Sequence, residues 1–276
     1  MIDLARFSPL GFGVTGPHAS RIANTGHVSR LIREALAAGV TYFDTGPAYG
    51  NGRGEIRLGR ALEGVDRNQV FISTKAGIHA GRVRDFSPGA VEMSLKASLE
   101  RLGLEHVDLL LLHGPAPQEL TPKLISHLRA FKKRGLFHHL GICGRGAELE
   151  EAIRIEEIDT IMAPVNASLS AEELDRLERC KQSGLSVIGI EALKGTAASA
   201  RLPVSHASAW YLARAIKQTL SGQAPERAGQ TPAEALSFAL DHKLTDSVIS
   251  LTTKLAHLHA NARLAGLNPP HSQPNS

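Results

Sequence analysis

The chain has 276 residues, of which 42% are hydrophobic and 21% charged, a composition typical of a soluble globular protein with a sizeable core. The formal net charge of +4 is small for this length and gives no indication of nucleic-acid binding. Two cysteines, Cys143 and Cys180, are too few for a disulfide framework. No stretch approaches the ~20 apolar residues needed to cross a bilayer, and the N-terminal segment lacks a signal-peptide pattern, so we expect a cytoplasmic protein without a membrane partner.

Eight short apolar segments recur along the chain and are predicted to be strands. Most are almost continuously apolar, as strands buried on both faces are. In chain order they lie around Gly11 and at residues 41–44, 70–75, 107–113, 139–143, 160–165, 185–191 and 247–251.

Amphipathic segments between these strands predict helices at residues 27–39, 87–103, 122–135, 171–184 and 232–242. Ser87, Thr121, Ser170 and Thr231 stand at their N-cap positions, and Glu173 completes a capping box with Ser170. Residues 195–205 and 221–230 are rich in small and polar residues and are predicted to be loops.

Alternation of strand and helix repeated eight times predicts an α/β fold, a single-domain (β/α)8 TIM-type barrel over residues 1–267. Residues 268–276 are predicted to be a disordered tail. A doubly wound open sheet is the alternative, but no GxGxxG motif leads from the first strand into a helix.

Four polar residues follow successive predicted strands, where the active site of a barrel lies. Asp44, Lys75 and His113 each end a strand, and Tyr49 follows Asp44 in the loop GPAYGNG. Alone, a strand-end Asp or His is commonly structural, but a lysine after an apolar strand needs a partner. A phenol is a weak acid at neutral pH, and a nearby ammonium lowers its pKa. The four residues together predict a site that donates a proton to a developing alkoxide, with a nicotinamide or similar cofactor supplying the hydride.

The sequence resembles the aldo-keto reductase family. The resemblance rests on four segments in the family's order: GVTYFDTGPAYGNGRGEIRLGRAL, VFISTKAG, SLERLGLEHVDLLLLHGP and SVISLTTKLAHLHANARLA. Weaker similarity extends over roughly residues 8–265. The resemblance implies a (β/α)8 barrel and an extended NADPH without a Rossmann domain. It implies that Tyr49 is the general acid/base, that Lys75 and Asp44 tune it, and that His113 orients the substrate.

The resemblance also indicates where the cofactor would bind, and there the chain departs from the family. Cys143-Gly144 stands in place of the family's Ser-Asn, Met162 in place of Gln, and Ile190 in place of the aromatic residue that stacks on the nicotinamide. Glu191 follows, with Lys194 as its expected partner or with a local turn to cap. The remaining cofactor-binding residues implied by the alignment are Asn166, Leu193, Thr252, Thr253, Lys254, His257 and Asn261.

Two functions therefore stay open. The first is an NADP(H)-dependent oxidoreductase, with NAD(H) possible, that acts on a small carbonyl or sugar-like substrate. The second is a barrel with a weakened nicotinamide site, acting as a binding or regulatory protein or in non-redox acid/base chemistry. A metal-dependent hydrolase is disfavoured because Lys75 would repel a metal and no Cys/His set has zinc spacing, so no metal ligands are predicted. The oligomeric state is not readable from the sequence.

Overall fold

The computed structural model describes residues 7–194, 196 and 229–270. Its eight strands are all parallel and close into one barrel in sequence order. The strands are β1 (Leu10–Gly13), β2 (Tyr42–Asp44), β3 (Phe71–Ala76), β4 (Val107–His113), β5 (Phe137–Cys143), β6 (Thr160–Pro164), β7 (Ser186–Ile190) and β8 (Ser247–Ser250). The predicted single-domain (β/α)8 barrel is confirmed, and the open doubly wound sheet is wrong.

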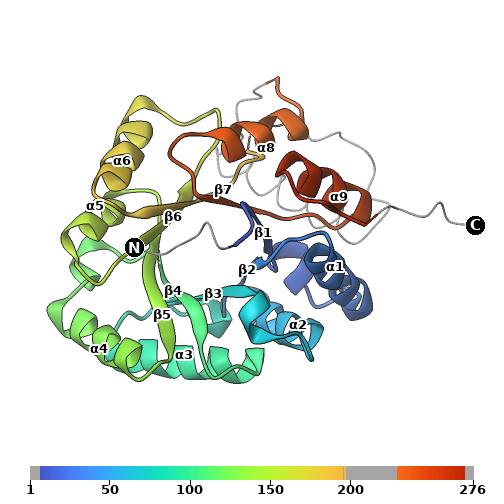
Figure 1. Cartoon of the computed structure of the whole chain (residues 1–276). Coiled ribbons are helices and arrows are strands. Elements are labelled where there is room, and N and C mark those ends of the chain that lie inside the picture. The colour runs from blue at the N-terminus through green and yellow to red at the C-terminus, as the bar shows by residue number, and fades with distance from the viewer. Residues whose placement is uncertain (1–6, 195, 197–228, 271–276) are drawn as a thin grey trace, which may run out of the picture.

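Helices surround the strands on the outside of the barrel (Figure 1). Those described are α1 (Thr25–Ala37), α2 (Arg53–Ala61), α3 (Pro88–Leu102), α4 (Pro122–Lys133), α5 (Ala147–Arg154), α6 (Ala171–Gln182), α8 (Pro232–Asp241) and α9 (Leu255–Leu264). Short 3-10 turns are η2 (Gly16–Ala19), η3 (Arg67–Gln69), η4 (Ala80–Arg82) and η5 (Pro117–Glu119). None of the described helices is long and apolar enough to cross a membrane.

Three of the predicted helix starts carry the expected side-chain cap. Thr121 accepts a hydrogen bond from Leu124 N (3.2 Å), and Ser170 and Thr231 form capping boxes with glutamates three residues on. Ser87 is also at an N-cap, but its side chain does not cap α3. The backbone N–H of Ser87 donates to Asp85 Oδ1 (2.7 Å), and its side chain caps nothing, so the predicted side-chain cap is wrong.

The strands separate two apolar layers. Inside the barrel, Tyr42, Phe71, Leu109, Leu111, Cys143, Met162 and Ile188 form one cluster. Between the strands and the helices, a larger cluster includes the predicted stripe of α1, from which Val28, Leu31, Ile32 and Ala35 are buried. Burial on both faces explains why the strand sequences are continuously apolar.

The loops predicted at residues 195–205 and 221–230 lie almost entirely outside the described residues, as do residues 271–276 of the predicted tail. The structure therefore leaves these predictions, and the boundary at residue 267, untested.

The buried carboxylate of Glu55 connects helix α2 to its neighbours. Glu55 of α2 is fully buried, accepts a hydrogen bond from Thr74 Oγ1 (2.6 Å) on β3, and pairs with Arg101 Nε (2.6 Å) on α3. Glu55 therefore joins α2 to β3 and α3.

Replacing Glu55 by alanine is expected to lower the free energy of unfolding by about 3 kcal/mol, because it leaves Arg101 and Thr74 without their buried partner. Urea denaturation followed by circular dichroism measures the change. Glu63→Ala, which alters an exposed carboxylate just beyond the same helix, is the control. Equal midpoints for the two variants would contradict the assigned role.

Candidate active site

A buried ion pair lies at the carboxyl ends of β2 and β3. Lys75 Nζ donates to both carboxylate oxygens of Asp44 (2.6 and 2.7 Å) and to the carbonyl oxygen of Thr45 (2.9 Å). The two residues are only 1% and 3% exposed, so water does not solvate the charges. Ser73 Oγ adds a hydrogen bond to Asp44 Oδ1 (2.7 Å). The three protons of the ammonium group thus have acceptors within this cluster.

Tyr49 and His113 lie against this pair. Lys75 Nζ is 5.1 Å from the centre of the Tyr49 ring, and the rings of Tyr49 and His113 meet edge to face with their centres 5.9 Å apart. Gly46 makes this approach possible, since a Cβ there would lie 3.3 Å from Tyr49 Cε2 and 3.4 Å from Lys75 Cβ. The structure therefore brings all four residues of the predicted quartet together.

The electrostatics of Tyr49 differ from the simple expectation. Burial raises the pKa of the Tyr49 phenol, the charge of Lys75 opposes that rise, and the result is a pKa of about 12. The expected lowering by Lys75 is therefore present but smaller than the effect of burial. Burial alone would lower the pKa of Lys75, yet Asp44 and Tyr49 raise it above its usual value. The resting site holds a protonated phenol beside a charged ammonium.

His113 is held in its neutral form. Burial, and after it the positive charges of Lys75 and Arg145, lower the pKa of His113 to about 3. Within the described residues, its buried Nδ1 has no hydrogen-bond partner. A neutral imidazole has one N–H donor and one acceptor nitrogen, so it can hydrogen-bond a substrate oxygen without taking its proton.

The candidate nicotinamide contacts form an apolar floor beside the quartet. Cys143 pairs in register with His113 and with Met162, and Ile190 packs on the same interior cluster. Burial raises the pKa of the Cys143 thiol to about 11, so it is a neutral group. Nearby backbone groups are already engaged, since Gly144 N donates to Met162 O (3.0 Å) and Cys143 O accepts from Gly114 N (2.7 Å).

Glu191 does not pair with Lys194 through its side chain. Its carboxylate forms an ion pair with Arg145, across the end of β6, while its carbonyl oxygen accepts from Lys194 N (2.9 Å). Glu191 has a φ of 56°, a left-handed conformation uncommon for this residue type. Asn166 is buried and donates to the Glu191 carbonyl (3.4 Å). Leu193 and Lys194 are exposed beyond them.

The residues after β8 surround the N-terminus of α9. Lys254 is the N-cap and is exposed, and no side chain caps this helix end. Thr252 Oγ1 accepts from Lys254 N (3.3 Å), and the carbonyls of Thr252 and Thr253 accept from two histidines of the η2–α1 region. His257 is exposed on α9, and Asn261 donates to Ser250 Oγ (3.1 Å). The backbone N–H groups at the start of α9, which no side chain caps, and the ammonium group of Lys254 can together bind an anion.

Three contributors were missed by sequence reasoning. Ser73 and Thr45 hold the Asp44–Lys75 pair, and Arg145 reaches the site from the loop after β5. A serine or threonine near a strand end carries no distinctive signal. Arg145 could have been noticed as a charge directly after a strand end.

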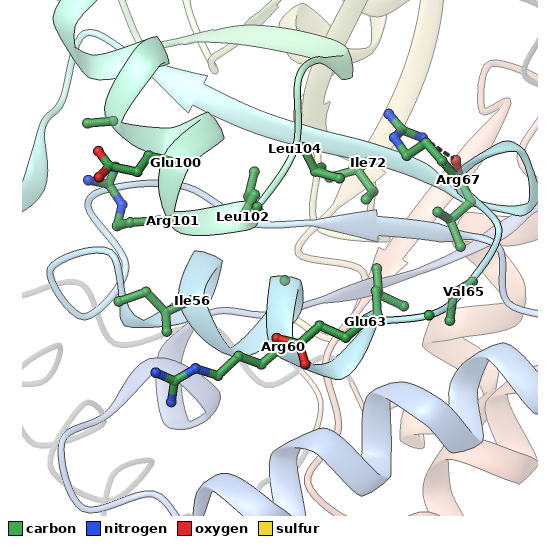
Figure 2. Close-up of a pocket in the computed structure, with 16 residues that line it drawn as sticks. Ile56, Arg60, Glu63, Val65, Arg67, Ile72, Glu100, Arg101, Leu102 and Leu104 are labelled. Atoms are coloured by element: carbon green, nitrogen blue, oxygen red, sulfur yellow. Dashed lines mark hydrogen bonds between the residues drawn. The ribbon is translucent and has the colours of Figure 1, made fainter.

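Two other features lie outside this site. A groove of about 810 Å³ runs between α2 and α3 on the outside of the barrel, with Ile56, Arg60 and Leu104 among its lining residues (Figure 2). Near the opposite end of the strands, ligand-type atoms of His106, Asp108 and His138 lie within 4.8 Å of one another. No quartet residue belongs to either feature.

The comparisons with known proteins agree with this geometry. The model of the aldo/keto reductase family matches residues 9–272, so the chain belongs to this family of oxidoreductases. It is 26% identical over 301 aligned positions to D-threo-aldose 1-dehydrogenase from a Pseudomonas species, covering 90% of this chain and 88% of that one. It is 28% identical to L-galactose dehydrogenase from Arabidopsis thaliana, covering 92% and 81%. It is 29% identical to NADH-specific methylglyoxal reductase from Escherichia coli, covering 56% of this chain and only 53% of that reductase.

Solved structures share the fold. An aldo-keto reductase from Bacillus halodurans, in its holo form, superposes with a TM-score of 0.73 at 23% identity, covering 96% of this chain and 89% of that chain. An aldo-keto reductase from Klebsiella pneumoniae in complex with NADPH gives 0.70 at 20% identity, covering 95% and 89%.

His113 is expected to stay neutral from pH 8 down to pH 5, because its pKa of about 3 lies far below the usual histidine pKa of about 6.5. In the unfolded chain the ring gains a proton below about pH 6.5, so this residue makes folding progressively less stable as the pH falls from there toward 3. Imidazole ¹⁵N chemical shifts, assigned with His113→Gln, measure the titration. A titration midpoint of His113 at or above pH 5 would contradict the prediction.

Proposed function

We propose that this protein is an NADP(H)-dependent reductase of a small polar aldehyde or ketone, or the dehydrogenase of the matching alcohol or aldose, with Tyr49 as the general acid/base. The observation that carries the proposal is the contact of Tyr49 with both a buried Lys75–Asp44 pair and a neutral His113. Relatives named for aldoses and for methylglyoxal support a polar carbonyl substrate.

The proton chemistry follows from the charges. With a pKa of about 12, the Tyr49 phenol is protonated at neutral pH and can donate to an alkoxide, which is a stronger base. Lys75 then stabilises the phenolate that remains, and Asp44 holds Lys75 in place and keeps it charged. His113, as a neutral imidazole, orients the carbonyl oxygen toward Tyr49.

The residues present fit a nicotinamide dinucleotide. When bound, the reduced nicotinamide supplies the hydride. Cys143, Met162 and Ile190 offer an apolar surface for its ring beside the quartet. Lys254 and the uncapped N-terminus of α9 offer a site for a phosphate, which favours NADP(H) over NAD(H).

One observation favours a second function. The only side-chain donor among Cys143, Met162 and Ile190 is the weak thiol S–H of Cys143, and the backbone N–H of Gly144 beside it already donates to Met162. A chain that bound nicotinamide weakly would be a binding or regulatory barrel, or would use Tyr49 and Lys75 for non-redox acid/base chemistry. Fluorescence titration with NADPH decides between the two, since low-micromolar binding supports the reductase and no binding supports the second function.

Replacing Tyr49 by phenylalanine is expected to lower kcat for NADPH-dependent aldehyde reduction by about a hundredfold or more, because it removes the proton donor and keeps the ring. Steady-state oxidation of NADPH measures the effect. The affinity for NADPH should stay within about twofold of the parent value, which controls for folding and cofactor binding. Undiminished turnover in this variant would remove Tyr49 from its assigned role.

Replacing Lys254 by glutamine is expected to raise the KM for NADPH about tenfold and to leave the KM for NADH nearly unchanged, because one charge-assisted contact with the additional phosphate is lost. Lys243→Gln is the matched control, since Lys243 precedes β8, at the opposite end of this strand, where it pairs with Glu178. Equal effects of Lys254→Gln on both cofactors would refute a phosphate-binding role.

A further inference from the structure

Three arginines lie on the two loops that flank the strand of His113. His113 ends β4, whose neighbours in the barrel are β3 and β5. The loop after β3 carries Arg82 and Arg84, and the loop after β5 carries Arg145. Arg145 follows by two residues the register partner of His113, Cys143. Arginine therefore borders the catalytic end of β4 on both sides.

These cations act on the candidate active site. Arg82, Arg84 and Arg145 all contribute, with burial and Lys75, to lowering the pKa of His113. The charge of Lys75 is already matched by Asp44 inside the site. Arg84 and Arg145 are also paired, with Glu119 and Glu191, but unlike Lys75 they are exposed, so an incoming substrate can contact them.

Arg145 is held by Glu191 and has further N–H donors that can bind a ligand. Its Nη2 bonds Glu191, whose left-handed backbone lies at the end of β7. A guanidinium carries five N–H donors, so pairing with one carboxylate oxygen leaves others free to bind a second anion. The side chain is 59% exposed, which leaves it accessible to a ligand. Glu148, the other carboxylate near this loop, accepts from the backbone N–H groups of residues 145 and 146.

The loop after β3 presents its arginines differently. Arg84 pairs with Glu119 and lies over the ring of Phe86, 4.8 Å from its centre. Arg82 is exposed and has no ion pair within the part of the chain that the structure describes. Its φ of 65° is uncommon for arginine, and such conformations persist where the surrounding structure fixes them. Here the loop is fixed by a hydrogen bond from Gly81 N to Asn51, two residues after Tyr49.

We propose that the substrate is an anionic carbonyl compound, and that Arg145 and Arg82 bind its carboxylate or phosphate while Tyr49 and His113 engage the carbonyl oxygen. The inference rests on the proposed carbonyl reduction and adds the class of substrate. Planar guanidinium groups match the geometry of carboxylate and phosphate oxygens, which a neutral sugar hydroxyl does not exploit as strongly.

Matched pairs of aldehydes test the class. Butanal and succinic semialdehyde differ by a carboxylate, and glyceraldehyde and glyceraldehyde phosphate differ by a phosphate. We expect the anionic member of at least one pair to have a KM about tenfold lower, and the pair that shows the difference identifies the anion. The advantage should shrink in high salt, because screening weakens exposed charges. Equal KM values within both pairs would overturn this inference and leave the proposed reduction intact. Absence of turnover with all four aldehydes would overturn the proposed reduction and this inference together.

Two variants test the residues. Arg145→Gln and Arg82→Asn should each lower kcat/KM for the anionic aldehyde three- to tenfold more than for its neutral partner, with the difference appearing in KM. Asparagine tolerates the left-handed backbone at position 82, and Arg145→Lys should restore part of the loss. Arg154→Gln, an exposed arginine on α5 paired with Glu151, is the control and should match the parent protein. A loss shared equally by the neutral aldehyde, or one confined to the KM for NADPH, would overturn the assignment.

Discussion

The buried Lys75–Asp44 pair is the interaction on which the rest of the site depends. An ammonium and a carboxylate that are almost completely withdrawn from water persist only when each is paired and hydrogen-bonded. Here the closed barrel supplies the partners, because β2 and β3 lie side by side and end at the same rim. The carbonyl oxygen of Thr45 accepts a hydrogen bond from Lys75, and the hydroxyl of Ser73 donates one to Asp44. Because the ammonium protons of Lys75 are all donated within this cluster, Lys75 acts on Tyr49 through its positive charge.

The barrel interior determines how strongly that charge acts. Below the pair lies an apolar layer that includes Leu109 and Leu111, and little water is available to weaken an electric field there. The same burial raises the pKa of the Tyr49 phenol and lowers that of His113. Desolvation and the Lys75 charge thus have opposite effects on Tyr49 but the same effect on His113. One environment therefore produces a protonated phenol next to a neutral imidazole.

Much of this arrangement was predictable from the sequence, and the exceptions have physical reasons. Strands buried on both faces are continuously apolar, so all eight were found, and the barrel then brought the three strand-end residues and Tyr49 together. Helix α2 was not predicted, because its sequence RGEIRLGRA is highly polar and follows a glycine-rich loop. The pairing of Arg145 with Glu191 joins residues 46 apart, and no local pattern announces such a contact. The expected partner, Lys194, is nearer in sequence, but its contact with Glu191 is a backbone hydrogen bond and its side chain is exposed.

The apolar floor beside the quartet places different demands on binding than the polar quartet itself. Cys143, Met162 and Ile190 belong to one apolar cluster, while Arg145 and Glu191 form a charged pair at the rim. Apolar contact with a ring is insensitive to orientation, whereas hydrogen bonds to a carboxamide fix it. A molecule bound on an apolar surface must therefore be oriented by charged groups at its ends, because the attraction between charges extends further than apolar contact. The arginines around His113 and the uncapped end of α9 carry such charges, so under the proposed function we expect specificity to depend on these charges more than on the apolar floor.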